Sequence, residues 1–166
     1  MSNVISRSIP PQSIVNLVNP AVRMVLESPL HAALDKTLLV LHITGRRTGR
    51  HYDIPVGYID LDGRLFVVTQ HAWRANLRGR ADVEVTHRGR RLLMHAELDD
   101  DPRCVAAAFA RVIERLGLRT GQRRLGITIH SRRTPSPSEL EAAVRDFDLA
   151  RLTLTAPTAV TGRLER

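Results

Sequence analysis

The sequence has little cysteine, few aromatic residues and no long apolar run. Its 166 residues include one cysteine, Cys104, which excludes an internal disulfide and favours a reducing cytoplasm. Charges or prolines interrupt every apolar stretch, so no transmembrane helix is expected, and the first residues do not resemble a signal peptide. Aromatic residues make up 4% of the chain, without the paired aromatics of a typical RNA-binding sheet.

Familiar catalytic motifs are also missing. There is no Gly-x-Ser-x-Gly elbow, and Cys104 falls in a segment with helical apolar spacing, which predicts a buried and inert thiol. The seven histidines show neither His-x-His nor His-Glu-x-x-His spacing, so no metal site is expected. Neither a Gly-x-Gly-x-x-Gly nor a Walker-type loop occurs. The sequence therefore indicates binding chemistry and leaves catalytic residues unknown.

The charge of the chain is strongly positive and comes almost entirely from arginine. The formal net charge is +8, and Lys36 is the one lysine among 25 basic residues. Arginine presents a planar fork of donors that suits phosphate and carboxylate, which favours an anionic partner. A GC-rich genome explains the same bias equally well. Nucleic acid is a disfavoured partner, because no basic recognition helix accompanies the charge.

Three segments with different patterns divide the chain. Residues 1–36 are predicted to form a helical arm broken at Asn19-Pro20 and Ser28-Pro29. Its apolar residues would dock on the protein's own core, with a partner subunit or a membrane surface as alternatives. Residues 37–156 are predicted to form one domain, and residues 157–166 a polar tail.

The first part of this domain alternates with period two, which is typical of strands. Tight turns are expected at Asp62-Gly63 and Arg88-Gly89. The predicted strands cover residues 38–44, 51–60, 65–69, 82–86 and 92–98. Five strands joined mostly by hairpins favour a small antiparallel barrel or sandwich.

The second part mixes helices and strands. Asp101-Pro102 predicts the start of a helix that ends at Gly117. A short strand is expected near residues 125–130. Ser136 and Glu139 have the spacing of a capping box at the start of a second helix, and a last strand follows at residues 152–154.

A glycine-framed turn at residues 45–50 carries three arginines directly after an apolar strand. Gly45 and Gly49 permit backbone angles that other residues resist, and Arg46, Arg47 and Arg50 supply guanidinium groups. Such a turn suits an oxyanion, above all a phosphate. A second basic segment at residues 73–80 contains the only tryptophan, and both segments would flank one cleft if their strands were neighbours.

These two segments, in this order, resemble the deazaflavin-dependent nitroreductase and quinone reductase family. The resemblance covers about residues 19–102 and rests on Thr44-Gly45-Arg46-Arg47-Thr48-Gly49 and Trp73-Arg74-Ala75-Asn76-Leu77-Arg78. It implies a mainly β (α+β) fold, a split antiparallel β-barrel related to pyridoxamine phosphate oxidase, with the helical arm and flanking helices around it. The loop before Trp73 is shorter than in typical relatives.

The resemblance also implies a cofactor, the phosphate- and glutamate-bearing deazaflavin coenzyme F(420), with FMN as the alternative. The basic turn would hold the phosphate, the end of the third strand would border the ring, and the tryptophan segment would close the pocket. The cofactor-binding residues expected on this basis are Arg46, Arg47, Thr48, Gly49, Arg50, Tyr52, Val68, Thr69, Gln70, His71, Trp73, Arg74 and Asn76.

The function expected from these observations is hydride transfer from a reduced deazaflavin to a quinone, nitro compound or similar acceptor. Two alternatives stay open: an FMN-binding oxidoreductase on the same barrel, and a non-catalytic basic module that binds nucleic acid or an acidic partner. The resemblance favours a homodimer over a monomer. The expected location is the cytoplasm, with peripheral membrane contact through the N-terminal arm as an option.

Overall fold

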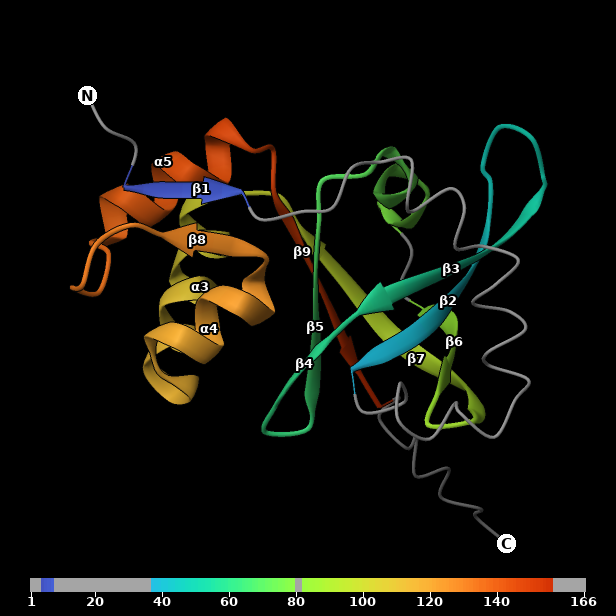
Figure 1. Ribbon diagram of the computed structural model, residues 1–166. Coiled ribbons are helices and arrows are strands. Elements are labelled where there is room, and N and C mark those ends of the chain that lie inside the picture. Colours follow the sequence, from blue (N-terminus) through green and yellow to red (C-terminus); the bar gives the residue numbers. More distant parts are fainter. Residues whose placement is uncertain (1–3, 8–36, 80–81, 157–166) are drawn as a thin grey trace, which may run out of the picture.

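An antiparallel sheet of seven strands is the main element of the computed structural model, which describes residues 4–7, 37–79 and 82–156. Its strands are β2 (Leu38–Thr44), β3 (His51–Gly57), β4 (Ile59–Leu61), β5 (Arg64–Thr69), β6 (Asp82–His87), β7 (Arg90–Asp99) and β9 (Ala150–Thr155). Their order across the sheet is β3-β2-β6-β7-β9-β5-β4. Figure 1 shows this sheet beside a layer of helices.

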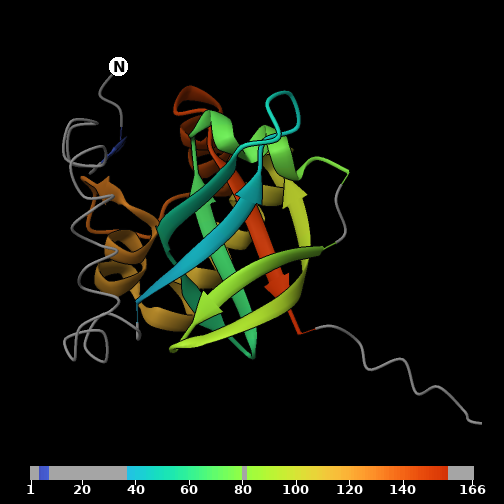
Figure 2. The same ribbon diagram turned by 90° about the vertical axis from the view of Figure 1, so that its right-hand side faces the viewer.

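The sheet curls into a barrel because its two edge strands follow one another in the chain. β3 lies at one edge and β4 at the other, yet only Tyr58 separates them. The chain therefore changes its pairing partner from β2 to β5 at this point, so the segment 51–60 forms two strands instead of one. The amide of Tyr58 donates a hydrogen bond to the carbonyl of Thr37 at 3.1 Å. Figure 2 shows the curled sheet from the side.

Side chains alternate between the two faces of each strand, so the sheet has a separate hydrophobic core on each side. Inside the barrel, one face of β2, β5, β6, β7 and β9 contributes buried apolar side chains, among them Leu41, Val85 and Leu152. The opposite face of β5 and β9 turns Phe66 and Arg151 toward the helices. The second core lies there, between the sheet and the helical layer.

The helical layer contains α3 (Pro102–Leu116), α4 (Leu118–Leu125) and α5 (Pro137–Asp146), with a small sheet of β1 (Ile5–Arg7) and β8 (Ile127–Ile129). The carboxylate of Asp101 caps α3, and Ser136 and Glu139 form the predicted capping box of α5. α4 is not predicted by the sequence pattern. It packs closely on α3, since a Cβ at Gly121 would lie 2.9 Å from the Cα of Ile113.

The structure confirms the predicted mainly β (α+β) split barrel with flanking helices. Both hairpins form at the predicted turns, where Asp62 and Arg88 adopt positive φ angles of 55° and 50°. The final strand, β9, lies between β7 and β5 in the middle of the sheet. None of the helices in the described ranges is long and apolar enough to cross a membrane.

Most of the predicted helical arm over residues 1–36 lies outside the described residues, as does the tail 157–166. Residues 4–7 of the arm are described, and three of them form strand β1 where a helix was expected. The reason is a long-range pairing that local patterns do not reveal: Ile5 lies opposite Ile129, and Arg7 opposite Ile127.

Candidate functional site

The arginine-bearing turn connects β2 to β3 and has a defined backbone conformation. The amide of Gly45 donates to the carbonyl of Arg50 at 2.8 Å, and the amide of Gly49 donates to the carbonyl of Gly45 at 2.9 Å. Gly49 has a φ of +66°, which other residues rarely adopt. A Cβ at Gly45 would lie 2.8 Å from Oγ1 of Thr48 and 3.1 Å from the ring of Tyr52. Both glycines are therefore required by the shape of the turn.

This turn is fastened to the tryptophan segment, which forms the short 3-10 helix η1 (Ala72–Leu77). The backbone amide of Arg46 donates to Oδ1 of Asn76 at 3.1 Å, and Nδ2 of Asn76 donates to the carbonyl of Trp73 at 3.2 Å. The guanidinium of Arg46 donates to the carbonyl of Arg78. The two basic segments that the sequence analysis singled out thus lie together.

The side chains of the other two arginines of the turn, Arg47 and Arg50, are exposed to solvent. Neither side chain forms a hydrogen bond or ion pair within residues 4–7, 37–79 and 82–156. The hydroxyl of Thr48 accepts the backbone amide of Arg50 at 3.3 Å. The turn therefore presents two guanidinium groups that no described residue neutralises, on a fixed backbone, which is a suitable arrangement for an anion.

The side chain of Arg74, in contrast, is bound by other groups of the protein. Its side chain is 12% exposed, and its Nη2 contacts both carboxylate oxygens of Asp148 at 2.7 Å. Its Nη1 donates to the carbonyl of Asp148 at 2.6 Å and to that of Thr69 at 3.4 Å. Thr69 is buried, and its hydroxyl accepts the amide of His71 at 3.0 Å. These contacts connect η1 to the end of β5 and to the loop before β9.

His71, just after β5, is close enough to the charges of Arg7 and Arg74 to be affected by them. Partial burial lowers the pKa of its imidazole, and the positive charges of Arg7 and Arg74 lower this pKa further. His71 is therefore neutral at neutral pH. Burial also lowers the pKa of Arg7 to about 10, and Nε and Nη1 of Arg7 have no hydrogen-bond partner in the part of the chain that is described. Arg7 is not among the predicted site residues, because only the pairing of β1 with β8 brings it here.

The remaining residues of the predicted cofactor site have different surroundings. Trp73 is half-buried and packs against the barrel core, whereas Tyr52 is 41% exposed beside the arginine turn. Gln70 is half-buried just after β5. Val68 faces the helical layer and packs against that second core. The structure thus brings Tyr52 and the arginine turn together and places Val68 on the outer face of the sheet.

Cys104 differs from its predicted burial. It is exposed, because it occupies the solvent side of the first turn of α3. The negative charge of Asp99, followed by desolvation and the charge of Asp101, raises the pKa of its thiol. The thiol is therefore protonated and a poor nucleophile. Among the described side chains, no group of three His, Cys, Asp or Glu is arranged to hold a metal ion.

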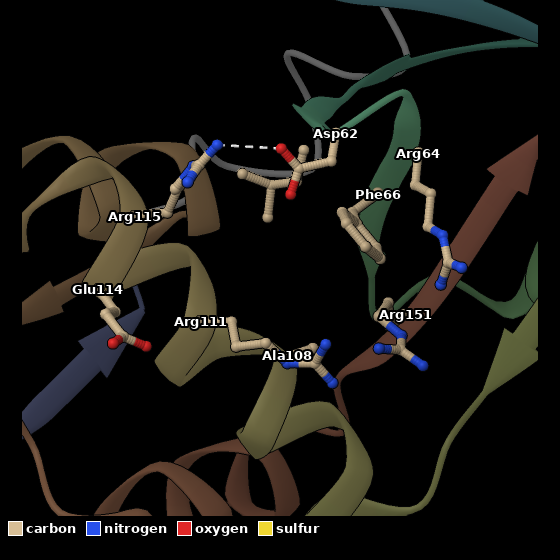
Figure 3. A pocket seen from close by; sticks show the side chains of 9 residues that line it. Asp62, Arg64, Phe66, Ala108, Arg111, Glu114, Arg115 and Arg151 are labelled. Carbon is tan, nitrogen blue, oxygen red and sulfur yellow. Dashed lines mark hydrogen bonds and ion pairs between the residues drawn. The ribbon is translucent and has the colours of Figure 1, made fainter.

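Two grooves lie elsewhere on the described structure. One of about 820 Å³ lies between α3 and the β4–β5 hairpin (Figure 3). The other, of about 500 Å³, is lined by residues of β2 to β5 and of α4, and Val68 is the predicted site residue that it contains. Neither groove is lined by the arginine turn or by η1.

Comparison with solved structures finds several proteins of low sequence identity. An F420-H2 dependent reductase (FDR-A) is 12% identical, with a TM-score of 0.40, over 71% of this chain and 94% of its own. The haem storage protein HutZ from Vibrio cholerae is 13% identical, with a TM-score of 0.45, over 85% and 91%. A pyridoxamine 5'-phosphate oxidase-related, FMN-binding protein from Nostoc punctiforme is 14% identical, with a TM-score of 0.43, over 90% and 82%.

The sequence itself matches none of the curated proteins. It does match the family described as F420H(2)-dependent quinone reductase, over residues 18–129. This range covers more than half of the chain and includes the arginine turn, η1 and most of the barrel. The protein therefore belongs to the F420H(2)-dependent quinone reductase family, a family of oxidoreductases.

Proposed function

We propose that this protein is an oxidoreductase that transfers a hydride from reduced coenzyme F(420) to a small electron-poor acceptor such as a quinone or a nitro compound. The observation that carries the proposal is the turn at residues 45–50. Two of its arginines, Arg47 and Arg50, have no side-chain partner among the described residues, and Asn76 fixes its backbone. Family membership supplies the identity of the cofactor class.

The donors of this turn fit the anionic part of such a cofactor. A guanidinium has only donors, and a phosphate has only acceptors at neutral pH, so Arg47 and Arg50 would hold the phosphate. Each charge-assisted hydrogen bond is worth about 1.5–3 kcal/mol. The exposed hydroxyl of Thr48 offers one more donor beside them. The turn would therefore anchor the cofactor by its charged end.

The residues after β5 would act at the other end of the cofactor. The deazaflavin ring supplies the hydride when the cofactor is bound. Trp73 would give that end of the site an apolar wall and help to exclude water. Gln70 and the neutral imidazole of His71 would donate or accept hydrogen bonds without adding charge. Asn76 and Arg74 are positioning residues, because their polar groups already contact Arg46, Trp73 and Asp148.

Replacing Arg47 and Arg50 together tests the proposal. Arg47→Gln/Arg50→Gln should weaken binding of F(420) by at least about tenfold, which corresponds to 1.4 kcal/mol. Thermal stability should change little, since both side chains are exposed. The matched control is Arg90→Gln/Arg132→Gln, which removes the same charge from exposed positions elsewhere.

Titrations with F(420) and FMN at moderate salt, followed by fluorescence, provide the readout. Equal losses in the two double variants would show that overall charge, and not the turn, governs binding. Tighter binding of FMN than of F(420) would favour the FMN-binding alternative. Steeply salt-dependent binding of nucleic acid, without a saturable flavin site, would favour the basic module.

The assembly state follows from the same family resemblance. We propose a homodimer, and Leu93, which is 54% exposed on β7, is an apolar side chain available for such a contact. Light scattering after size exclusion should then give twice the chain mass of 18.6 kDa. The chain mass itself would refute the dimer. Action in the cytoplasm and membrane contact through the arm remain predictions.

A further inference from the structure

The groove between α3 and the β4–β5 hairpin has a floor of one aromatic ring and a rim of arginines. Phe66 on β5 points into it, and Arg64, Arg111 and Arg151 approach from β5, α3 and β9 (Figure 3). The volume of about 820 Å³ lies within the range of sites for small organic ligands. The groove thus combines a flat apolar surface with several cationic donors.

The charges of this groove are not balanced. Four guanidiniums line it, against the carboxylates of Asp62 and Glu114. Arg115 contacts Asp62 at 3.0 Å. Arg64 and Arg111 are exposed and have no hydrogen bond or ion pair with any described residue. Two guanidinium groups are therefore available on facing elements, with an excess of positive charge to attract an anion.

The same face of the sheet holds two buried polar atoms that have no hydrogen-bond partner among the described residues. Arg151 is fixed by an ion pair with Asp99 at 3.0 Å, and its guanidinium lies 5.7 Å from the centre of the Phe66 ring. Its Nε is buried without a hydrogen-bond partner within the described ranges. The hydroxyl of Thr153, whose residue pairs with Phe66 across the two strands, is buried without a partner there as well. Arg151 itself lines the groove, so one of these buried donors lies beside the excess of positive charge.

This groove is separate from the proposed cofactor turn. Its lining residues on β5 are Arg64 and Phe66, with Arg151 of β9 opposite Val68, whereas Gln70 and His71 follow the end of β5. Five steps of extended chain between Arg64 and Thr69 amount to roughly 17 Å. The groove also lies on the outer face of the sheet, under α3, away from the barrel interior.

We propose that this groove is a second binding site, for a small phosphorylated organic ligand of nucleotide size. Its phosphate groups bridge the guanidiniums of Arg64 and Arg111, and its flat part lies against Phe66. A phosphate suits this pair of arginines because its several oxygens accept hydrogen bonds from two guanidiniums at once. The aromatic ring and the volume require a ligand larger than inorganic phosphate.

Calorimetric titration with adenosine 5′-diphosphate at 100 mM salt tests this site. We expect saturable binding to the full-length protein and at least tenfold weaker binding of either inorganic phosphate or adenosine alone. Arg64→Gln/Arg111→Gln should weaken adenosine 5′-diphosphate binding at least tenfold, while Arg90→Gln/Arg132→Gln changes it less than twofold. Phe66→Leu, which keeps an apolar side chain, should weaken adenosine 5′-diphosphate but not inorganic phosphate.

The outcomes separate this site from the cofactor turn. Unchanged affinity in Arg64→Gln/Arg111→Gln, or no binding of adenosine 5′-diphosphate by the unmodified protein, overturns the second site. If Arg64→Gln/Arg111→Gln also weakens F(420) tenfold, the groove belongs to the cofactor site and the proposal of a separate ligand fails. If Arg47→Gln/Arg50→Gln leaves F(420) binding intact while the groove variants lose adenosine 5′-diphosphate, the proposed function fails and the second site stands.

Discussion

Asn76→Ala removes the side chain whose two hydrogen bonds connect the arginine turn to η1; we call this pair of hydrogen bonds the Asn76 clasp. Two hydrogen bonds disappear: from the amide of Arg46 to Oδ1, at 3.1 Å, and from Nδ2 to the carbonyl of Trp73, at 3.2 Å. Each contributes about 0.5–1.5 kcal/mol, and the site is partly open to water, so we expect a loss of about 1–2 kcal/mol. For a chain of this size that lowers Tm by roughly 3–6 °C.

We expect Asn76→Ala to weaken cofactor binding by more than the loss of folding stability alone explains. Without the clasp, Arg47 and Arg50 must be ordered when the cofactor binds, which costs conformational entropy. We expect F(420) affinity to fall about tenfold, equivalent to 1.4 kcal/mol. Binding is measured by fluorescence titration and stability by calorimetry, both on the full-length protein.

Ser136→Ala is the matched control for this experiment. It removes the hydroxyl that accepts the amide of Glu139 at the start of α5, which also costs about 1 kcal/mol of stability. Its F(420) affinity should stay within twofold of the unmodified protein. If Asn76→Ala loses no more affinity than Ser136→Ala, the clasp does not organise the turn for binding, and that part of our reasoning is wrong.

Two further predictions concern stability. Thr153→Val should raise Tm by roughly 2–4 °C, because it removes a buried hydroxyl without a partner in the described structure, a gain of about 1 kcal/mol; a lower Tm would show that the hydroxyl has a partner. The lowered pKa of His71 means that its contribution to stability is complete above pH 6.5, the ordinary pKa, and is lost as pH falls below it, since the unfolded chain then binds the proton more readily. His71→Gln should reduce the fall in Tm between pH 7 and pH 5, and an unchanged slope would assign that fall to other groups.

The sequence alone determined the local elements of this protein. Asp62 and Gly63 form a hairpin because both tolerate positive φ, and Ser136 starts α5 because its side chain and that of Glu139 satisfy backbone groups within one turn. The alternation of β2, β5 and β6 follows from the same short-range rule. Each of these signals acts over a few residues, so the printed sequence is enough to find them. The family resemblance, carried by two short segments, was also readable and is confirmed over residues 18–129.

Only the tertiary structure decided how these elements meet. β9 pairs with β7 and β5, and β1 pairs with β8. The residue pattern of each strand does not reveal which strand it pairs with. The same holds for polar contacts. The amide of Arg46 binds the side chain of Asn76, 30 residues away in the sequence, and the side chain of Arg74 binds Asp148, 74 residues away. In the sequence, Arg46, Arg47 and Arg50 looked alike. The fold buries or pairs some arginines and leaves Arg47, Arg50, Arg64 and Arg111 without internal partners among the described residues, because pairing depends on which surfaces are brought together when both cores close.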